Sequence, residues 1–325
     1  MEKNQSIQIT LPHISMSMPN EQYHRGEWQK EFVSSTTLKN FLVSPKFFKY
    51  SLLNPKQINP QSALQGSIYH SMMESLCNND CIDGVWEEFF LFDAPVNPKT
   101  GLVYGMTTKA YQEAYQEAQE INGGKTPCSQ EDITLAKTMV DNLLNNCGQT
   151  SEVVKYLLQI GSAEVSFFGE YQGAKFKFRT DLKTNNKIVD WKTIACDDLH
   201  EDTINKQIIK MNYGFSAAFY QFFCHHITGK WNEFYWVFQQ KSAPYDAVIV
   251  SSAPYAYSQD FNGDIIKGVS AIEFEKVLSQ YIKCSQEQYY PGAEYLIEPT
   301  LGYRIMYPKV PTYKANSIIN FFNND

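Results

Sequence analysis

Three charged residues, Asp181, Asp190 and Lys192, offer the clearest chemistry in this sequence. Asp190 and Lys192 are two residues apart, and on a β-strand such side chains leave the same face. Asp181 comes shortly before them and can lie beside them if the chain folds back. Two carboxylates and an ammonium group at the edge of a sheet suit a hard divalent cation such as Mg²⁺, which keeps several waters for substrate phosphates. The pattern therefore indicates phosphodiester hydrolysis.

The surrounding sequence predicts the hairpin that would bring these groups together. Residues 175–181 read as one strand, Asn185-Asn186 as a tight turn, and residues 187–193 as the returning strand. A further strand over residues 163–171 precedes the hairpin. A lysine in this setting is either a structural ion-pair partner or a catalytic cation that steadies a charged transition state.

Helical patterns flank these strands. A capped helix starts at Ser35 and restarts at Ser44-Pro45, because proline suits the first helical turn. Apolar residues recur at helical spacing through 62–77. The other predicted elements are an irregular stretch over 80–106, helices over 108–120, 129–146, 201–227 and 270–288, and strands over 231–239 and 246–251. The order predicts an α/β or α+β core of mixed sheet flanked by helices, with residues 80–150 as an added helical layer.

Composition limits the class of protein. The chain has 325 residues and a net charge of −7, which disfavours a non-specific nucleic-acid coat but not a nuclease that binds phosphate through a metal. Seven dispersed cysteines without a Cys-x-x-Cys pair predict reduced thiols, with neither a zinc site nor an iron–sulfur cluster. No apolar run approaches a membrane span. We expect a soluble, cytoplasmic protein without a membrane partner.

Two further residues are candidates for the site. Gly66 lies four residues before His70 on a predicted helix, so nothing overhangs the imidazole and a strand, metal or phosphate can approach. The alternative for His70 is a surface or packed histidine. Glu164 begins the strand before Asp181 and could complete a metal shell or orient a water. Equally, it could be an exposed strand glutamate.

Four residues could bind DNA or brace the site. Arg179 shares a strand face with Asp181 and could bind phosphate, or pair with Asp181 or Glu164. Tyr213, Ser216 and Tyr220 fall on one face of a predicted buried helix, where their hydroxyls need partners. The alternative for these three is core packing with satisfied hydroxyls.

Taken together, these residues resemble the PD-(D/E)xK nuclease superfamily and, within it, the RecE-type exodeoxyribonuclease VIII group of phages and prophages. The resemblance covers most of residues 34–290. It rests on the Ser35-to-Phe48 helix, Gly66…His70, the segment from Lys99 to Tyr111, Ala163-Glu164, Arg179-x-Asp181 and Asp190-Trp191-Lys192-Thr193. The implied fold is a restriction-endonuclease-like mixed sheet core flanked by helices.

The resemblance also implies roles for these positions. His70, Asp181 and Asp190 would bind metal, with the Trp191 carbonyl as a further ligand. Lys192 would be the catalytic lysine and Glu164 an accessory acid. The metal would be Mg²⁺, with Mn²⁺ able to substitute. Ser216 stands where the group usually has glutamine in its Tyr-x-x-Gln-x-x-x-Tyr pattern, which questions a DNA or active-site contact from this helix.

The expected function is a Mg²⁺-dependent deoxyribonuclease, most specifically a 5′→3′ double-strand exonuclease for phage-type recombination in a bacterial or phage-infected cell. The resemblance implies double-stranded DNA ends as substrate, a homo-oligomer and a single-strand annealing protein as partner. Alternatives are a non-catalytic DNA-binding or assembly protein that keeps the fold, and an endonuclease. The expected organisation is a polar segment 1–33, a nuclease domain 34–290 with the helical insertion 80–150, and a tail 291–325 for assembly or a partner.

Overall fold

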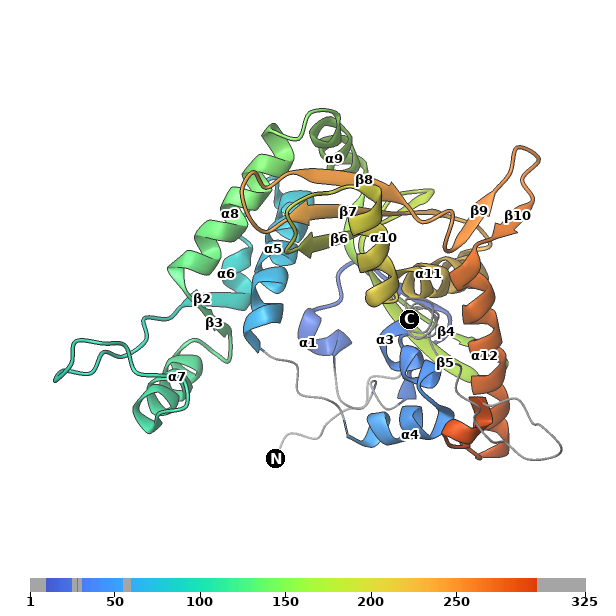
Figure 1. The fold of residues 1–325 in the computed structure, drawn as a ribbon, viewed down its shortest axis with the longest axis horizontal. Coiled ribbons are helices and arrows are strands. Elements are labelled where there is room, and N and C mark those ends of the chain that lie inside the picture. The colour runs from blue at the N-terminus through green and yellow to red at the C-terminus, as the bar shows by residue number, and fades with distance from the viewer. Residues whose placement is uncertain (1–9, 25–27, 29–30, 55–59, 297–325) are drawn as a thin grey trace, which may run out of the picture.

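A six-stranded mixed sheet forms the centre of the protein, in a computed structural model that describes residues 10–24, 28, 31–54 and 60–296 (Figure 1). The strand order is β1-β4-β5-β6-β7-β8. Neighbouring strands are antiparallel except β6 and β7, which are parallel. The strands are β1 (His13–Ser15), β4 (Ser162–Tyr171), β5 (Ala174–Lys183), β6 (Lys187–Ile194), β7 (Glu233–Gln240) and β8 (Ala247–Ser251). The prediction of a mixed sheet flanked by helices is confirmed.

Helices cover both faces of this sheet (Figure 1). One face packs against α5 (Pro60–Asn79), α8 (Gln130–Asn145) and α9 (Gln149–Ile160). The other packs against α3 (Ser35–Leu38), the 3₁₀ helix η1 (Lys39–Leu42), α4 (Pro45–Leu53), α10 (Glu201–Lys210), α11 (Tyr213–Thr228) and α12 (Val269–Glu287). Alternation of buried side chains along each strand supplies both faces: Phe234, Trp236 and Phe238 of β7 face α11, while Val237 faces α5 and α8. The sheet is therefore covered by packed helices on both sides.

The smaller elements lie outside the central layers. Residues 80–128 contain α6 (Val85–Glu88), α7 (Lys109–Ile121) and a parallel pair β2 (Phe89–Leu91) and β3 (Thr126–Cys128). This segment extends from one end of the molecule, and the hairpin of β9 (Tyr257–Gln259) and β10 (Ile265–Lys267) projects from the other (Figure 1). The amino-terminal part contains α1 (Asn20–Tyr23), and η2 (Ala293–Leu296) ends the described chain.

Sequence patterns located most helices and strands correctly. The restart at Ser44-Pro45 is real, since the Ser44 side chain accepts a hydrogen bond from Phe47 N–H at the start of α4. Ser129 and Asp132 form the predicted capping box of α8. Residues 80–106 are not wholly irregular, because α6 and β2 lie there. Helix α9 and the short strands β1, β3, β9 and β10 were not predicted.

The prediction of one long helix over residues 201–227 is wrong. Asn212 adopts a left-handed conformation with φ of 50°, which ends α10 and starts α11. Asparagine tolerates this conformation better than most residues, so the sequence permits a break that apolar periodicity does not reveal. The break points α11 in a new direction, with Tyr213 at its first residue.

The predicted polar segment 1–33 contributes β1, which pairs with β4, so part of it belongs to the central sheet. The predicted tail 291–325 lies mostly outside the described residues. None of the described helices is both long and apolar enough to cross a bilayer.

Candidate active site

The site lies where β5 and β6 part. Their ladder has two pairs, Leu182 with Val189 and Lys183 with Ile188. Beyond these pairs β5 continues beside β4 and β6 beside β7. Where the strands separate, the side chain of Asp181 replaces the backbone pairing: its carboxylate accepts a hydrogen bond of 2.7 Å from the Trp191 backbone N–H. The gap between the strands thus begins at a carboxylate fixed in place by main chain.

Asp190 and Lys192 lie on the second strand of this gap. Lys192 Nζ donates to Asp190 Oδ1 at 2.7 Å and to the Trp191 carbonyl oxygen at 3.3 Å. Both side chains are largely buried, with 13% of Asp190 and 19% of Lys192 exposed. Asp181, Asp190 and Lys192 are therefore brought together, as the hairpin pattern predicted.

The charges of this group are strongly coupled. Burial, reinforced by the neighbouring Asp181 carboxylate and opposed by the attraction of Lys192, raises the pKa of Asp190 to about 6. Burial opposes the charge of Lys192 as well, but the two carboxylates outweigh it and its pKa is raised. Two carboxylates and one ammonium leave this trio with one net negative charge, which a metal ion or the protonated imidazole of a neighbouring histidine can balance.

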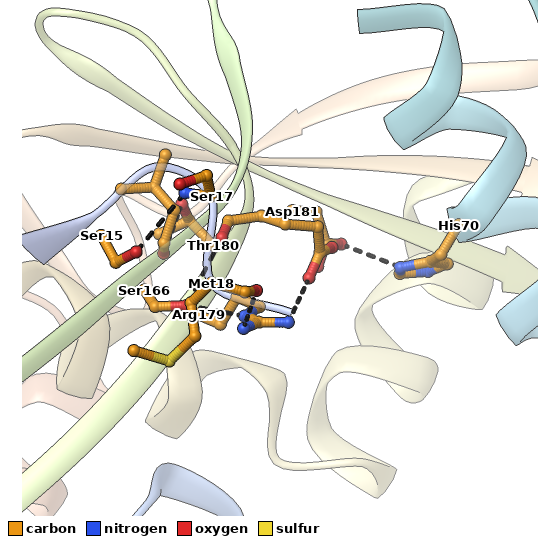
Figure 2. Close-up of polar contacts among 10 residues, drawn as sticks. Ser15, Ser17, Met18, His70, Ser166, Arg179, Thr180 and Asp181 are labelled. Carbon is orange, nitrogen blue, oxygen red and sulfur yellow. Dashed lines mark hydrogen bonds and ion pairs between the residues drawn. The ribbon is translucent and has the colours of Figure 1, made fainter. Parts of the chain in front are cut away.

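His70 reaches the site from helix α5 and not from the strands of the sheet. Its Nδ1 lies 3.4 Å from Asp181 Oδ2, and Figure 2 shows the imidazole facing that carboxylate. Burial favours the neutral ring, but Asp181 outweighs burial and raises the pKa of His70. Burial likewise opposes the charge of Asp181, and His70 outweighs it and holds the pKa of Asp181 well below its usual range. His70 is thus neither an isolated surface histidine nor buried among apolar side chains.

Glu164 lies opposite Asp181 in the β4–β5 register, between the pairs Ala163–Leu182 and Val165–Thr180. Its φ of 51° is left-handed, which costs a non-glycine residue about 1–2 kcal/mol. Such strain concentrates at functional positions. Burial, then Asp181 and Glu74, raise the pKa of Glu164 to about 8. Glu164 is thus the second carboxyl group, after Asp190, whose charged form is disfavoured by burial. A bound cation would stabilise the charged form of both.

Arg179 does not point freely at solvent. Its Nη1 lies 3.5 Å from Glu164 Oε2, Nε donates to Ser166 Oγ at 2.7 Å, and Nη2 donates to the Met18 carbonyl at 2.8 Å (Figure 2). The guanidinium also lies 4.2 Å from the ring centre of Tyr23. With 8% of its side chain exposed, Arg179 follows the pairing alternative and braces Glu164 against the amino-terminal segment.

The helix α11 contributes its tyrosines unequally. Lys192 Nζ lies 5.2 Å from the ring centre of Tyr213. Tyr220 is half-buried and hydrogen-bonds Ser35, and its pKa is raised well above the usual value by burial and then by Tyr23, Asp190 and Asp181. Ser216 lies between them, half-buried, with its backbone N–H 3.4 Å from the Asn212 carbonyl. Both tyrosines adjoin the charged group, whereas the backbone N–H of Ser216 bonds to Asn212, the residue at the start of its own helix.

Two site residues escaped the sequence analysis. Lys39 donates from Nζ to the Met211 carbonyl at 3.2 Å, and burial followed by repulsion from Lys192 lowers its pKa to about 8, against the attraction of Asp190. Glu74 influences the Glu164 carboxyl and has its own pKa raised by burial and by Glu88. Glu74 follows His70 by four residues, and this i, i+4 spacing on one helix face could have revealed it. Lys39 lay inside the recognised Ser35-to-Phe48 motif.

The donor atoms fit Mg²⁺ in kind. Mg²⁺ is typically held by one or two carboxylates and several waters, and Asp181, Asp190 and the Trp191 carbonyl provide such oxygens. The side chains do not stand ready as a complete shell: among the residues described, no three or more His, Cys, Asp and Glu side chains form a group that could hold a metal ion. The reason is that Asp190 turns to Lys192 and Asp181 to His70. A cation bound by these carboxylates would take the place of Lys192 and His70.

Gly66 gives a test of how open the helix beside His70 is. A Cβ atom at Gly66 would meet nothing of the described chain within 4 Å. We therefore expect Gly66→Ala to raise the free energy of unfolding by about 0.5–1 kcal/mol, because alanine is the better helix former. Urea denaturation followed by circular dichroism measures the change.

The matched control is Gly169→Ala on β4. There the Cβ atom would lie 2.4 Å from Phe176 Cζ, and that ring is stacked on Phe223 with centroids 3.6 Å apart. We expect a loss of about 1–3 kcal/mol from overpacking. Destabilisation of Gly66→Ala by a similar amount would contradict an open surface beside His70.

Comparison with known proteins agrees with this architecture. A crystal structure from Eubacterium rectale, described as that of a proposed exonuclease, superposes with a TM-score of 0.52 at 17% sequence identity, covering 93% of this chain and 99% of that one. At this identity the likeness shows the fold. No curated protein matches the chain. The family model described as a PDDEXK-like domain of unknown function (DUF3799) matches residues 34–298. The chain therefore belongs to this PDDEXK-like family.

Proposed function

We propose that this protein is a Mg²⁺-dependent deoxyribonuclease that hydrolyses phosphodiester bonds, and more specifically a 5′→3′ exonuclease acting on double-stranded DNA ends for phage-type recombination. The observation that carries the nuclease proposal is the junction of β5 and β6, where Asp181, Asp190 and Lys192 meet within hydrogen-bonding distance of one another or of shared main chain. The exonuclease polarity and the recombination role rest on the resemblance to the RecE-type group.

Each residue of the site has a task in this proposal. Asp181, Asp190 and the Trp191 carbonyl would hold the metal. When bound, Mg²⁺ supplies Lewis-acid polarisation of the scissile phosphate and lowers the pKa of water. Lys192 would move its ammonium from Asp190 to a phosphate oxygen and stabilise the negative charge that builds up there. His70 would keep Asp181 in position, and Glu164 would orient the attacking water.

The local charge supports a phosphate substrate despite the net charge of −7. Lys39, Arg179 and Lys192 cluster around the acids, and Lys39 carries a pKa near 8. An anionic phosphate would bring the pKa of Lys39 up again, because opposite charges stabilise each other. The cations therefore favour an anion in the same place where the acids favour a metal.

The experiment uses end-labelled linear duplex DNA and covalently closed circular DNA, each with Mg²⁺, Mn²⁺ or a chelator. We expect degradation of the linear duplex with either metal, intact circles, and no activity in the chelator. Labels at the 5′ and 3′ ends report polarity. Cleavage of circles would favour the endonuclease alternative, and no cleavage with either metal would refute the nuclease proposal.

Metal binding should weaken at acid pH. Because the pKa of Asp190 is raised to about 6, this carboxyl is ionised at pH 7 and about nine-tenths protonated at pH 5, and a protonated carboxyl does not bind Mg²⁺. We expect the dissociation constant for Mg²⁺ to be about tenfold higher at pH 5 than at pH 7. Calorimetric titration measures both values, with the exposed Glu113→Gln as control. Equal affinity at the two pH values would show that Asp190 is not a ligand.

A second candidate function is a non-catalytic DNA-binding or assembly protein. The closed ion pairs of His70 with Asp181 and of Lys192 with Asp190 favour it, since they satisfy the acids without metal. Ser216 in place of the glutamine of the resembled group also favours it. Binding of duplex DNA without any hydrolysis in Mg²⁺ or Mn²⁺ would select this candidate.

The proposal extends to assembly. From the resemblance we propose a homo-oligomer, with a single-strand annealing protein as partner. Residues 291–325 are the proposed arm for assembly or for that partner. The test is light scattering of the full chain beside a variant that ends at residue 296 and so lacks most of this arm. The expected result is fewer protomers per particle in the shortened variant.

A further inference from the structure

The amino-terminal segment, which consists of the described residues between 10 and 33, reaches the candidate active site. It lies outside the family domain, which covers residues 34–298. Strand β1 of this segment pairs with β4, and Val33 pairs with β5 by main-chain hydrogen bonds of 2.9 and 3.0 Å. The segment therefore lies against the two strands that carry Glu164 and Asp181.

An aromatic cluster anchors this segment on the sheet. Phe168 of β4 is fully buried in this cluster, which is separate from the two cores on either side of the sheet. Its ring centroid lies 5.9, 5.2 and 5.3 Å from those of Tyr23, Trp28 and Phe32, all in edge-to-face geometry. Aromatic pairs of this kind add to the stability that burial of their surface provides. The packing on Phe168 therefore fixes the position of Tyr23.

Tyr23 contacts two cations of β5. Its ring centre lies 4.2 Å from the Arg179 guanidinium and 4.5 Å from Lys177 Nζ, and its carbonyl oxygen accepts from Lys177 Nζ at 2.7 Å. A cation over the face of an aromatic ring is attracted by that ring. The Met18 carbonyl adds a hydrogen bond of 2.8 Å from Arg179 Nη2. A carbonyl and a ring face are neutral, so these contacts hold the guanidinium without competing with the Glu164 carboxylate for its charge.

The contacts of Arg179 define one orientation of its guanidinium (Figure 2). Nε donates to Ser166 Oγ at 2.7 Å, Nη2 donates to the main chain of the segment, and Nη1 lies 3.5 Å from Glu164 Oε2. Because the guanidinium is planar and its donors are fixed relative to one another, the ring of Tyr23 across its face completes the restraint. The ion pair in turn restrains the Glu164 carboxylate, to which we assign the orientation of the attacking water.

We propose that the amino-terminal segment is part of the active site and that Tyr23 is a positioning residue for hydrolysis. Tyr23 acts through Arg179, which it holds against Glu164, and is not itself catalytic. This inference rests on the proposed nuclease function, because its effect is on the rate of hydrolysis. An interaction that orients the attacking water is used in the transition state, so its loss lowers kcat and leaves KM for DNA unchanged.

The test compares two aromatic-to-leucine changes in the same cluster. Tyr23→Leu removes the ring beside Arg179, whereas Phe32→Leu removes a ring that also packs on Phe168 but lies 5.9 Å from Lys175 Nζ. Both variants should melt at a lower temperature than the wild type, since each loses buried aromatic surface. Rates on linear duplex DNA in Mg²⁺ are measured at a temperature where circular dichroism shows every variant folded. We expect Tyr23→Leu to lower kcat by about 10- to 100-fold, the usual loss when a group that orients an active-site residue is removed, and Phe32→Leu to keep the wild-type kcat.

Two further variants test whether Tyr23 acts through Arg179. Tyr23→Phe keeps the ring face and should keep kcat within about twofold of the wild type. In an Arg179→Met background, Tyr23→Leu should cause no further loss, because residues that act as one unit are not additive.

Three results would overturn the inference while the wild type cleaves DNA. They are an unchanged kcat in Tyr23→Leu, an equal loss in Phe32→Leu, and losses that multiply in the double variant. A wild type that cleaves no DNA would overturn the proposed function together with this inference.

Discussion

Asp190→Asn is expected to lower the rate of DNA hydrolysis by about a thousandfold, because a carboxylate ligand and its charge disappear while the shape of the side chain is kept. Metal ions contribute several kcal/mol of transition-state stabilisation, and about 1.4 kcal/mol corresponds to a factor of ten. The asparagine amide can still accept a hydrogen bond through Oδ1 from Lys192, which lies 2.7 Å from Asp190 Oδ1. The variant should therefore fold. Initial rates on end-labelled duplex DNA in Mg²⁺ measure the loss.

The matched control for Asp190 is Asp80→Asn. Asp80 is exposed, follows α5 and has a left-handed φ of 55°, a conformation that asparagine adopts readily. The same chemical change should leave both activity and stability as they are. Retention of wild-type activity in Asp190→Asn would remove Asp190 from the catalytic group and, with it, the role assigned to the β5–β6 junction.

Lys192→Met is expected to slow hydrolysis by about 100- to 1,000-fold, which is the usual loss when one group that stabilises transition-state charge is removed. The affinity for Mg²⁺, unlike the rate, should not fall in this variant. Lys192 neutralises part of the charge on Asp190 and lowers its pKa. Removing this ammonium frees both acids for Mg²⁺ but also raises the pKa of Asp190, so Mg²⁺ binding is compared at alkaline pH, where Asp190 is ionised in both proteins. We expect unchanged or tighter Mg²⁺ binding together with a lower maximal rate.

The conservative variant Lys192→Arg distinguishes charge from geometry. A guanidinium keeps the positive charge but spreads it over a planar group with a different reach. We expect an activity between those of Lys192→Met and the wild type. Weaker Mg²⁺ binding in Lys192→Met, in parallel with its loss of activity, would mean that the lysine only holds the acids in place.

The hairpin of β5 and β6 was predictable because its signals are local. Alternating side chains mark both strands, and the Asn185-Asn186 turn fixes their register, so Asp181 and Asp190 must meet. His70 could be predicted as a candidate through Gly66, but its contact with Asp181 depends on how α5 packs on the sheet. The elements that were predicted correctly are those in which the spacing of apolar side chains and the turn residues indicate the same structure.

The remainder depends on contacts between residues far apart in sequence. No local pattern indicates that Met18 and Tyr23 would enclose Arg179, which decides that this arginine pairs with Glu164. The left-handed Asn212 likewise splits a helix whose apolar pattern is continuous. The strain at Glu164 is also invisible in the sequence, because the strand pattern around it is regular.

The most direct test of the account is to locate a bound metal. Crystals of the protein soaked in Mn²⁺, with anomalous diffraction recorded at the manganese edge, should show an ion bound by Asp181 and Asp190. Lys192 should then have left Asp190, and Asp190→Asn crystals treated in the same way should lack the ion. An ion bound elsewhere, or acids still paired with Lys192 and His70 at saturating Mn²⁺, would contradict a metal-dependent hydrolytic site at the junction of β5 and β6.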